Sequence, residues 1–309
     1  MRIRATVVAA VSGALALSAL AAPAAQASDD AVSRADIAKV REAAHAASSS
    51  KAAFSARAAA YDEPYALNVT FSNFKIAKAV KVGTTNRVTA KVTYTLTHGT
   101  DVDITAFDFL TDPFLYKGSF AAPQNVLIGD DFGHCKSTSA TKATCSGTID
   151  IRPRDYELLN ADAGTWKAGA WAIAFNGEDP GADDFDMGKV GYAEKGGLAT
   201  TLVQRYSKLT VNASPEPVKK GKTITVTGKL TRANWEAFRY AGYTNQSVKL
   251  QFRKKNSNTY TTIKTVKTNS TGNLKTTVKA SVDGYYRYNF EGTTTTPAVK
   301  AAGDFVDVK

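Results

Sequence analysis

The chain has 309 residues, of which 39 are Lys or Arg and 28 are Asp or Glu, for a formal net charge of +11. Such a surplus can favour nucleic acid, but nothing in the sequence resembles a nucleic-acid-binding module, which argues against that class of partner. The three histidines follow no nucleophile motif and the carboxylates imply no substrate cleft, so an enzyme is not expected either.

The N-terminal segment has the three parts of a secretory signal. Arg2 and Arg4 precede an apolar run, and small residues precede a cleavage point near Ala27. The run is rich in alanine and falls short of the roughly 20 strongly apolar residues that a membrane-spanning helix needs. We therefore expect residues 1–27 to be a signal peptide, the mature protein to be extracellular, and no transmembrane anchor.

Residues 28–64 are rich in alanine and contain few large apolar side chains. A segment of this kind can form a helix, but it has little apolar surface to bury. It is interpreted as a mobile, partly helical stalk or linker, with a propeptide as the alternative.

From residue 65 onward, apolar and polar residues alternate with the period of two that indicates β-strands. The run 165–175, for example, places Trp171, Ile173 and Phe175 on one face. After residue 205 the same pattern repeats in about seven short strands separated by turns, which is typical of an immunoglobulin-like sandwich. The sequence predicts an all-β chain of two tandem Ig-like β-sandwich domains, residues 65–205 and 206–309.

The only two cysteines, Cys135 and Cys145, lie ten positions apart around a Ser/Thr/Lys segment that resembles the tip of a β-hairpin. An even count in a secreted chain favours a disulfide. Closing a loop of that size stabilises a fold by roughly 2.5–3 kcal/mol. A structural zinc site is disfavoured, because His134 is the only neighbouring ligand and a fourth is missing.

Charge is distributed unevenly between the two predicted domains. Residues 206–309 contain 18 Lys and Arg against 6 Asp and Glu, whereas residues 65–205 contain 14 against 16. The basic domain is expected to attract a cell-wall or other extracellular polyanion in a salt-sensitive manner. The candidate residues are Lys219, Lys220, Lys222, Arg253, Lys254 and Lys255. Alternatively, these cations serve only solubility and the protection of strand edges.

The densest acidic segment follows the predicted strand 165–175. Calcium needs six to eight oxygen ligands, and a loop rich in Gly and Asp can supply several of them. Its candidate ligands for Ca²⁺, the one cofactor considered, are Glu178, Asp179, Asp183, Asp184 and Asp186. The spacing does not match an EF-hand loop, and the alternative is a solvated connection between strands.

Aromatic residues divide into two predicted groups. Trp171 and Tyr286 lie on the apolar phase of their strands and are expected in the core. Four others, which lie in a long connection of the basic domain, are expected to be more exposed and to offer a sugar-stacking face. These are Trp235, Phe238, Tyr240 and Tyr243.

Residues 207–221, Trp235, and residues 243–253, 283–287 and 302–308 together resemble secreted actinobacterial two-domain proteins with a C-terminal Ig-like sandwich. Most members of that group are uncharacterised and some are labelled calcium-binding, so the resemblance implies calcium binding without identifying ligands. Together with the residue patterns, it favours a secreted, non-enzymatic binding or structural protein of the cell surface or extracellular matrix. The alternatives are a calcium-binding β-sandwich module and a secreted enzyme inhibitor.

Overall fold

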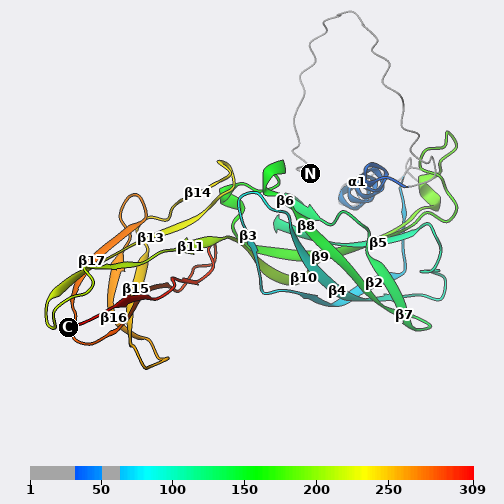
Figure 1. Cartoon of the computed structure of the whole chain (residues 1–309). Helices are drawn as coiled ribbons and strands as arrows, with labels where there is room; N and C mark the ends of the chain where they lie inside the picture. The colour runs from blue at the N-terminus through cyan, green and yellow to red at the C-terminus, as the bar shows by residue number, and fades with distance from the viewer. Residues whose placement is uncertain (1–31, 51–62) are drawn as a thin grey trace, which may run out of the picture.

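The computed structural model describes residues 32–50 and 63–309, which form two β-sandwiches joined end to end (Figure 1). The predicted signal peptide, residues 1–27, lies outside the described residues. Within the described ranges, no helix is both long and apolar enough to cross a membrane. The prediction of an all-β chain with two tandem Ig-like β-sandwiches is confirmed.

The first sandwich packs a six-stranded sheet against a four-stranded one. The six-stranded sheet has the order β1 (Tyr65–Ala66), β10 (Gly191–Arg205), β9 (Gly164–Ala174), β5 (Phe109–Gly118) and β6 (Pro123–Ile128), with β3 (Ala79–Val82) also pairing with β10. The four-stranded sheet has the order β2 (Val69–Ile76), β4 (Val88–His98), β8 (Lys142–Ile151) and β7 (His134–Ser139). The alternation along β4 buries Val92, Tyr94 and Leu96 between the sheets, as its period of two predicts.

Strands β7 and β8 form the predicted hairpin, in which Cys135 lies directly opposite Cys145. The two cysteines are joined by a disulfide, so this prediction is confirmed. Three short 3-10 helices complete this part of the chain: η1 (Pro153–Asp155), η2 (Asn160–Asp162) and η3 (Met187–Lys189).

The second sandwich consists of two five-stranded sheets. One contains β11 (Ser207–Leu209), β13 (Thr223–Asn234) and β12 (Asn212–Ser214), with β14 (Arg239–Gly242) and β17 (Asn273–Lys279) also paired to β13. The other contains β16 (Thr261–Lys267), β15 (Ser247–Lys254), β18 (Gly284–Phe290), β19 (Val299–Lys300) and β20 (Asp304–Val306). Tyr286 and Tyr288 of β18 are buried between the sheets, which confirms the core position predicted for Tyr286.

The junction between the sandwiches is built around Trp235, just beyond the end of β13. Its side chain is 0% exposed and belongs to the hydrophobic core of the first sandwich. The indole Nε1–H donates to the Val82 carbonyl at 3.3 Å, and the backbone N–H of Trp235 donates to Asn160 Oδ1 at 3.1 Å. The prediction that Trp235 is exposed is therefore wrong, because the hairpin β13–β14 carries it into the neighbouring domain.

Helix α1 (Arg34–Ser50) lies against the outer face of the six-stranded sheet (Figure 1). Ile37 and Val40 are buried there against Trp171, Ile173 and other side chains of β5, β9 and β10. This part of residues 28–64 is therefore a docked helix rather than a free stalk. Its small apolar surface is supplemented by ion pairs to the sheet, which the stalk interpretation did not foresee.

Candidate functional site

The six cations predicted to bind a polyanion gather at one end of the second sandwich. Lys219, Lys220 and Lys222 lie in the turn between β12 and β13, where the N–H of Lys220 donates to the carbonyl of the C-terminal Lys309 at 2.7 Å. Arg253 and Lys254 end β15 and Lys255 follows them, with its N–H donating to the Asp283 carbonyl at 3.0 Å. Asp283 in turn accepts from the N–H of Val308 at 2.9 Å, so the C-terminal segment connects both groups.

Most of this positive charge has no acidic partner. Lys255 Nζ lies 3.6 Å from Asp283 Oδ2. Among the described residues, none of the other five cations has a carboxylate oxygen within 4.0 Å. Their charge is therefore available to an external anion, although exposed lysines alone do not distinguish a binding site from a soluble surface.

Beside this end, the outer face of the sheet β16–β15–β18 carries a row of stacked cationic and aromatic side chains, which we call the Arg–aromatic ladder. Antiparallel pairing places Arg253 opposite Tyr285, and Tyr285 opposite Phe305 of β20. Arg287, two residues beyond Tyr285, points to the same face because side chains alternate along a strand. In spatial order, the ladder consists of Lys255, Phe305, Tyr285, Arg253, Tyr260 and Arg287.

The two guanidinium groups lie over aromatic rings at cation–π distance. The Cζ atom of Arg253 is 3.8 Å from the ring centroid of Tyr285 and 5.4 Å from that of Tyr260. The Cζ atom of Arg287 is 3.7 Å from the ring centroid of Tyr260. Stacking at these distances holds a long side chain in place without neutralising its charge.

Hydrogen bonds and a close backbone contact fix the ladder further. Arg253 Nη1 donates to the Ser257 carbonyl at 2.9 Å, and Arg287 Nε donates to Gln251 Oε1 at 2.9 Å. The hydroxyl of Tyr260 packs so closely on Gly303 that a Cβ at that glycine would lie 2.2 Å from it. Within the described ranges, no carboxylate oxygen lies within 4.0 Å of either guanidinium group, so their remaining N–H groups have no acidic partner.

Sequence reasoning identified Arg253 and Lys255 but did not group the four other members of the ladder with them. Two of them, Tyr285 and Arg287, could have been found from the strand Tyr285-Tyr286-Arg287, because alternation places Tyr286 inward and the side chains on either side of it outward. The stacking of Tyr260 and Phe305 on these residues depends on register between strands, which a single sequence does not specify.

The acidic segment predicted to bind calcium is a loop between β9 and η3, at the end of the first sandwich. Glu178 Oε1 pairs with Lys189 Nζ at 2.7 Å, while its Oε2 accepts from the N–H of Asp186 at 2.9 Å. The hydrogen bond from Lys189 lowers the pKa of Glu178. Asp179 and Asp186 accept from the N–H groups of Gly181 and Gly188.

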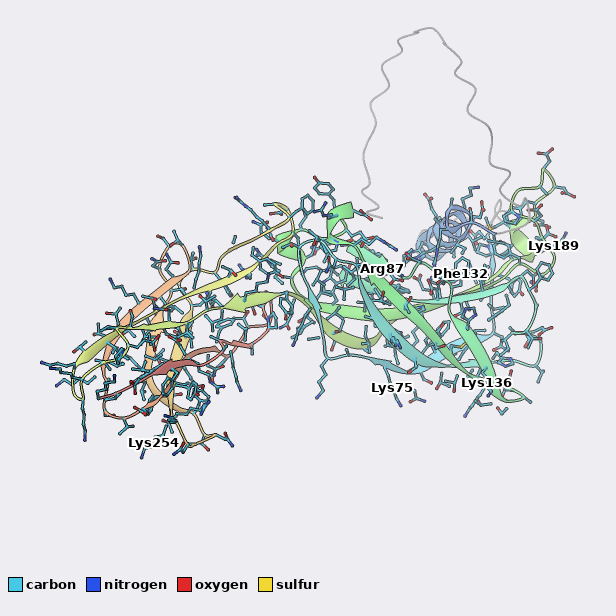
Figure 2. All side chains as sticks on the ribbon, viewed as in Figure 1. Lys75, Arg87, Phe132, Lys136, Lys189 and Lys254 are labelled. Carbon is cyan, nitrogen blue, oxygen red and sulfur yellow. A yellow bond between two sulfur atoms is a disulfide. The ribbon has the colours of Figure 1, made fainter. Side chains whose placement is uncertain are left out.

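The remaining two predicted ligands, Asp183 and Asp184, are exposed in the same loop. Across residues 32–50 and 63–309, no group of three or more His, Cys, Asp or Glu side chains is arranged to hold a metal ion. Calcium binding stays a prediction. Figure 2 shows Lys189, which ends η3 beside this loop, at the opposite end of the molecule from Lys254.

A shallow pocket of about 250 Å³ lies beside this acidic loop. It is lined by Asp101, Asp103 and Asp108 of the connection before β5, and by Asn176 and Gly177 at the start of the acidic loop, so these two connections meet at one end of the sandwich. The carboxylates are occupied locally: Asp103 Oδ1 accepts from Thr105, and Asp108 Oδ2 accepts from the N–H of Gly177 at 2.7 Å. Phe107, at the rim, is 92% exposed.

The three histidines lie on three different elements, α1, β4 and β7. His45 Nε2 is 2.7 Å from Glu194 Oε2 beneath helix α1, and His98 Nδ1 is 2.9 Å from the Gly99 carbonyl. His134 begins β7 and is exposed beside the disulfide hairpin. Each position is that of a structural or surface residue rather than of a general base poised beside a nucleophile.

The other exposed aromatics predicted for the basic domain are half-buried. The guanidinium of Arg232 lies 3.8 Å from the Tyr243 ring, and Lys208 Nζ lies 3.9 Å from the Tyr240 ring. Phe238 packs edge-on against Tyr156 of the first sandwich, with ring centroids 5.0 Å apart. Together with the burial of Trp235, these contacts remove the predicted sugar-stacking face, because each ring is already covered by a neighbour.

Comparisons with known proteins find similarity only among solved structures, since no family model and no curated protein matches this chain. An I-band fragment of titin, I67–I69, is 11% identical with a TM-score of 0.30 over 78% of this chain and 65% of that one, so the chain spans about two thirds of it. The adhesin InvE of Yersinia pseudotuberculosis is 13% identical with a TM-score of 0.22 over 77% and 58%. The D00–D0 domain of intimin is 18% identical with a TM-score of 0.24 over 77% and 99%.

Proposed function

We propose that this chain is a secreted, non-enzymatic binding protein of the cell surface or extracellular matrix, whose second sandwich binds an anionic polymer. The observation that carries the proposal is the Arg–aromatic ladder. It holds two guanidinium groups in fixed positions with no carboxylate within 4.0 Å among the described residues. A purely solubilising surface has no need to order two arginines in this way, since ordering long side chains costs conformational entropy.

The geometry favours recognition of oxyanions over stacking with sugar rings. The faces of Tyr260 and Tyr285 are covered by Arg253 and Arg287, so a sugar ring cannot lie flat on them. What the ladder offers instead is the edges of the guanidinium groups, whose N–H donors match a carboxylate or a phosphate. Because both cations lie over one Tyr260 ring, at 5.4 and 3.7 Å, they are at most about 9 Å apart and can contact successive charges of one chain.

The neighbouring lysines would add affinity that is less specific. Lys219, Lys220, Lys222 and Lys254 border the ladder around the C-terminal segment and raise the local positive potential. Their contribution falls steeply with ionic strength, because exposed charges are screened over about 8 Å at physiological salt.

The test compares binding to purified cell wall, to a soluble carboxylate polymer and to a neutral polysaccharide at low and high salt. The double variant Arg253→Gln/Arg287→Gln should lose at least roughly 10-fold in affinity for the anionic polymers, since even one hydrogen bond to a charged group contributes about 1.5–3 kcal/mol. The matched control is Lys264→Gln/Lys267→Gln on β16, which removes the same charge from outside the ladder and should cost less than about threefold.

Two outcomes would contradict the proposal in different ways. Equal losses in both double variants would mean that only the overall charge matters and that the ladder is not a binding site. An absence of any salt-sensitive binding to cell wall or to the polymers would reject the polyanion function itself. The calcium-binding and enzyme-inhibitor alternatives stay predictions, because no contact in the described part of the chain favours either of them over polyanion binding.

A further inference from the structure

Helix α1 occupies a face of the first sandwich that is lined with aromatic side chains and contains two buried carboxylates. Phe114 and Tyr116 of β5, Trp171 of β9 and Tyr192 of β10 form most of its apolar floor. Asp112 of β5 is 0% exposed in its side chain and Glu194 of β10 is 5% exposed. We call this face the helix groove; Phe132, which lines it, is labelled near α1 in Figure 2.

Each buried carboxylate is matched by cations of the helix. Arg34 Nη1 lies 2.6 Å from Asp112 Oδ2, and the same guanidinium lies 4.2 Å from the Phe132 ring. Arg41 Nη2 lies 2.6 Å from Glu194 Oε1, and His45 Nε2 lies 2.7 Å from Glu194 Oε2. Positions 34, 41 and 45 fall on one side of a helix, together with the apolar Ile37 and Val40.

The groove is therefore complementary to a basic amphipathic helix, and it is incomplete without one. Removing α1 would leave Asp112 and Glu194 among aromatic side chains without their cationic partners, and a buried carboxylate without a partner is either strongly unfavourable as a charge or must take up a proton. The Oδ1 atom of Asp112 has no hydrogen-bond partner among the described residues even with α1 in place. The acidic groups of the sheet thus select for the charge pattern of the occupying helix.

The attachment of α1 to its own groove is limited in two respects. Among residues 34–46 of the helix, whose side chains are described, only Ile37 and Val40 are buried, and a helix of 17 residues is marginally stable in water without such contacts. Twelve residues, 51–62, separate α1 from the described chain that leads to β1, and twelve extended residues reach about 40 Å. That reach allows the helix to enter either its own groove or that of a neighbouring molecule.

We propose that the helix groove also binds α1 of a second copy of this chain, so that two molecules exchange their N-terminal helices and form a reciprocal dimer. Exchange of an identical element reuses every contact seen within one chain and requires no new surface. The occupant is fixed by complementarity: Arg34, Arg41 and His45 meet Asp112 and Glu194 whichever molecule supplies the helix.

The test uses two full-length variants with opposite charge changes. In Arg41→Glu, and separately in Glu194→Arg, helix and groove of the same molecule carry like charges at this contact, so each protein alone should be monomeric. In an equimolar mixture, each helix meets an oppositely charged position only in the other variant. Light scattering after size exclusion should therefore give a mass twice that of either protein alone, and the wild-type chain should form some dimer at high concentration.

A double variant and a peptide keep the result decisive. Arg41→Glu/Glu194→Arg in one chain restores opposite charges within the molecule and should melt within a few degrees of the wild type. If it does so while the mixture stays monomeric, exchange is rejected. If the double variant is not folded, a labelled peptide of residues 32–50 is titrated into the wild-type chain. Failure of that peptide to bind, or equal binding of an Arg41→Glu peptide, likewise rejects the proposal.

Discussion

Replacing Trp235 by alanine removes the largest side chain that the second sandwich places in the core of the first. The indole is completely buried, and burial of a tryptophan removes roughly 150–250 Å² from water. At about 25 cal/mol per Å², this corresponds to about 4–6 kcal/mol, close to the 3–5 kcal/mol typical of large aromatic-to-alanine changes in cores. The lost hydrogen bond adds little, because the Val82 carbonyl also accepts from the N–H of Tyr206 at 2.8 Å.

Differential scanning calorimetry measures the effect without relying on tryptophan fluorescence. With about 2–4 °C per kcal/mol for a protein of this size, Trp235→Ala should lower the Tm of the first sandwich by roughly 10–20 °C. Trp235→Phe keeps most of the apolar volume and should cost less than half as much. Small-angle scattering should also show a broader range of shapes for Trp235→Ala, because the junction loses its main apolar contact.

A Tm within about 2 °C of the wild type for Trp235→Ala would refute this reasoning. It would mean that the junction contributes no net stabilisation and that the sandwiches are held together by the backbone connection and polar contacts alone. The contacts of Arg205 with the Ala233 carbonyl, at 2.6 Å, and of Asn160 with Asn234, at 2.8 Å, would then be the relevant ones.

Three further predictions concern the first sandwich. Replacing Cys135 and Cys145 together by serine should lower the free energy of unfolding by about 2.5–3 kcal/mol, measured in urea, and an unchanged midpoint would contradict the loop-closure argument. Burial, opposed by Arg34, raises the pKa of Asp112 to about 7. The contribution of protonated Asp112 to stability is therefore complete below about pH 4 and is lost as the pH rises through 7. Between pH 5 and 8 the wild type should lose more stability than Asp112→Asn, and parallel curves of unfolding free energy against pH would reject this. If the Glu178–Asp186 loop binds calcium, Lys189→Met should enlarge the difference in Tm between calcium and chelator, because Lys189 competes for Glu178; identical melts for both proteins would exclude the loop as a calcium site.

The parts of the fold that could be predicted from the sequence are those with local causes. Alternation along β9 and β18 follows from the geometry of a single strand, and it placed Trp171 and Tyr286 in buried positions. The disulfide was predictable because Cys135 and Cys145 belong to one hairpin. In each case, the interacting residues lie within about a dozen positions of one another.

Features that depend on distant residues were not predictable in the same way. Arg34 meets Asp112 across 78 positions, and His45 meets Glu194 across 149. In the sequence alone, an alanine-rich helix with scattered charges gives no sign that its basic side is the buried one. Trp235 likewise finds Val82 across 153 positions, and its long connection proved to be a hairpin directed at the other domain.

The two proposed sites show why a count of charges was a weak guide to function. In helix α1, the basic residues that face the sheet are matched by buried carboxylates, so their charge stabilises the fold or its exchange. In the Arg–aromatic ladder, Arg253 and Arg287 are held by rings instead, and stacking leaves their charge uncompensated. The residue type is the same in both places, and what differs is the partner that strand register brings opposite it. In these two places, a carboxylate across the contact distinguishes the arginines that hold the helix from the arginines whose charge stays available, which makes the ladder the more informative place to begin mutagenesis.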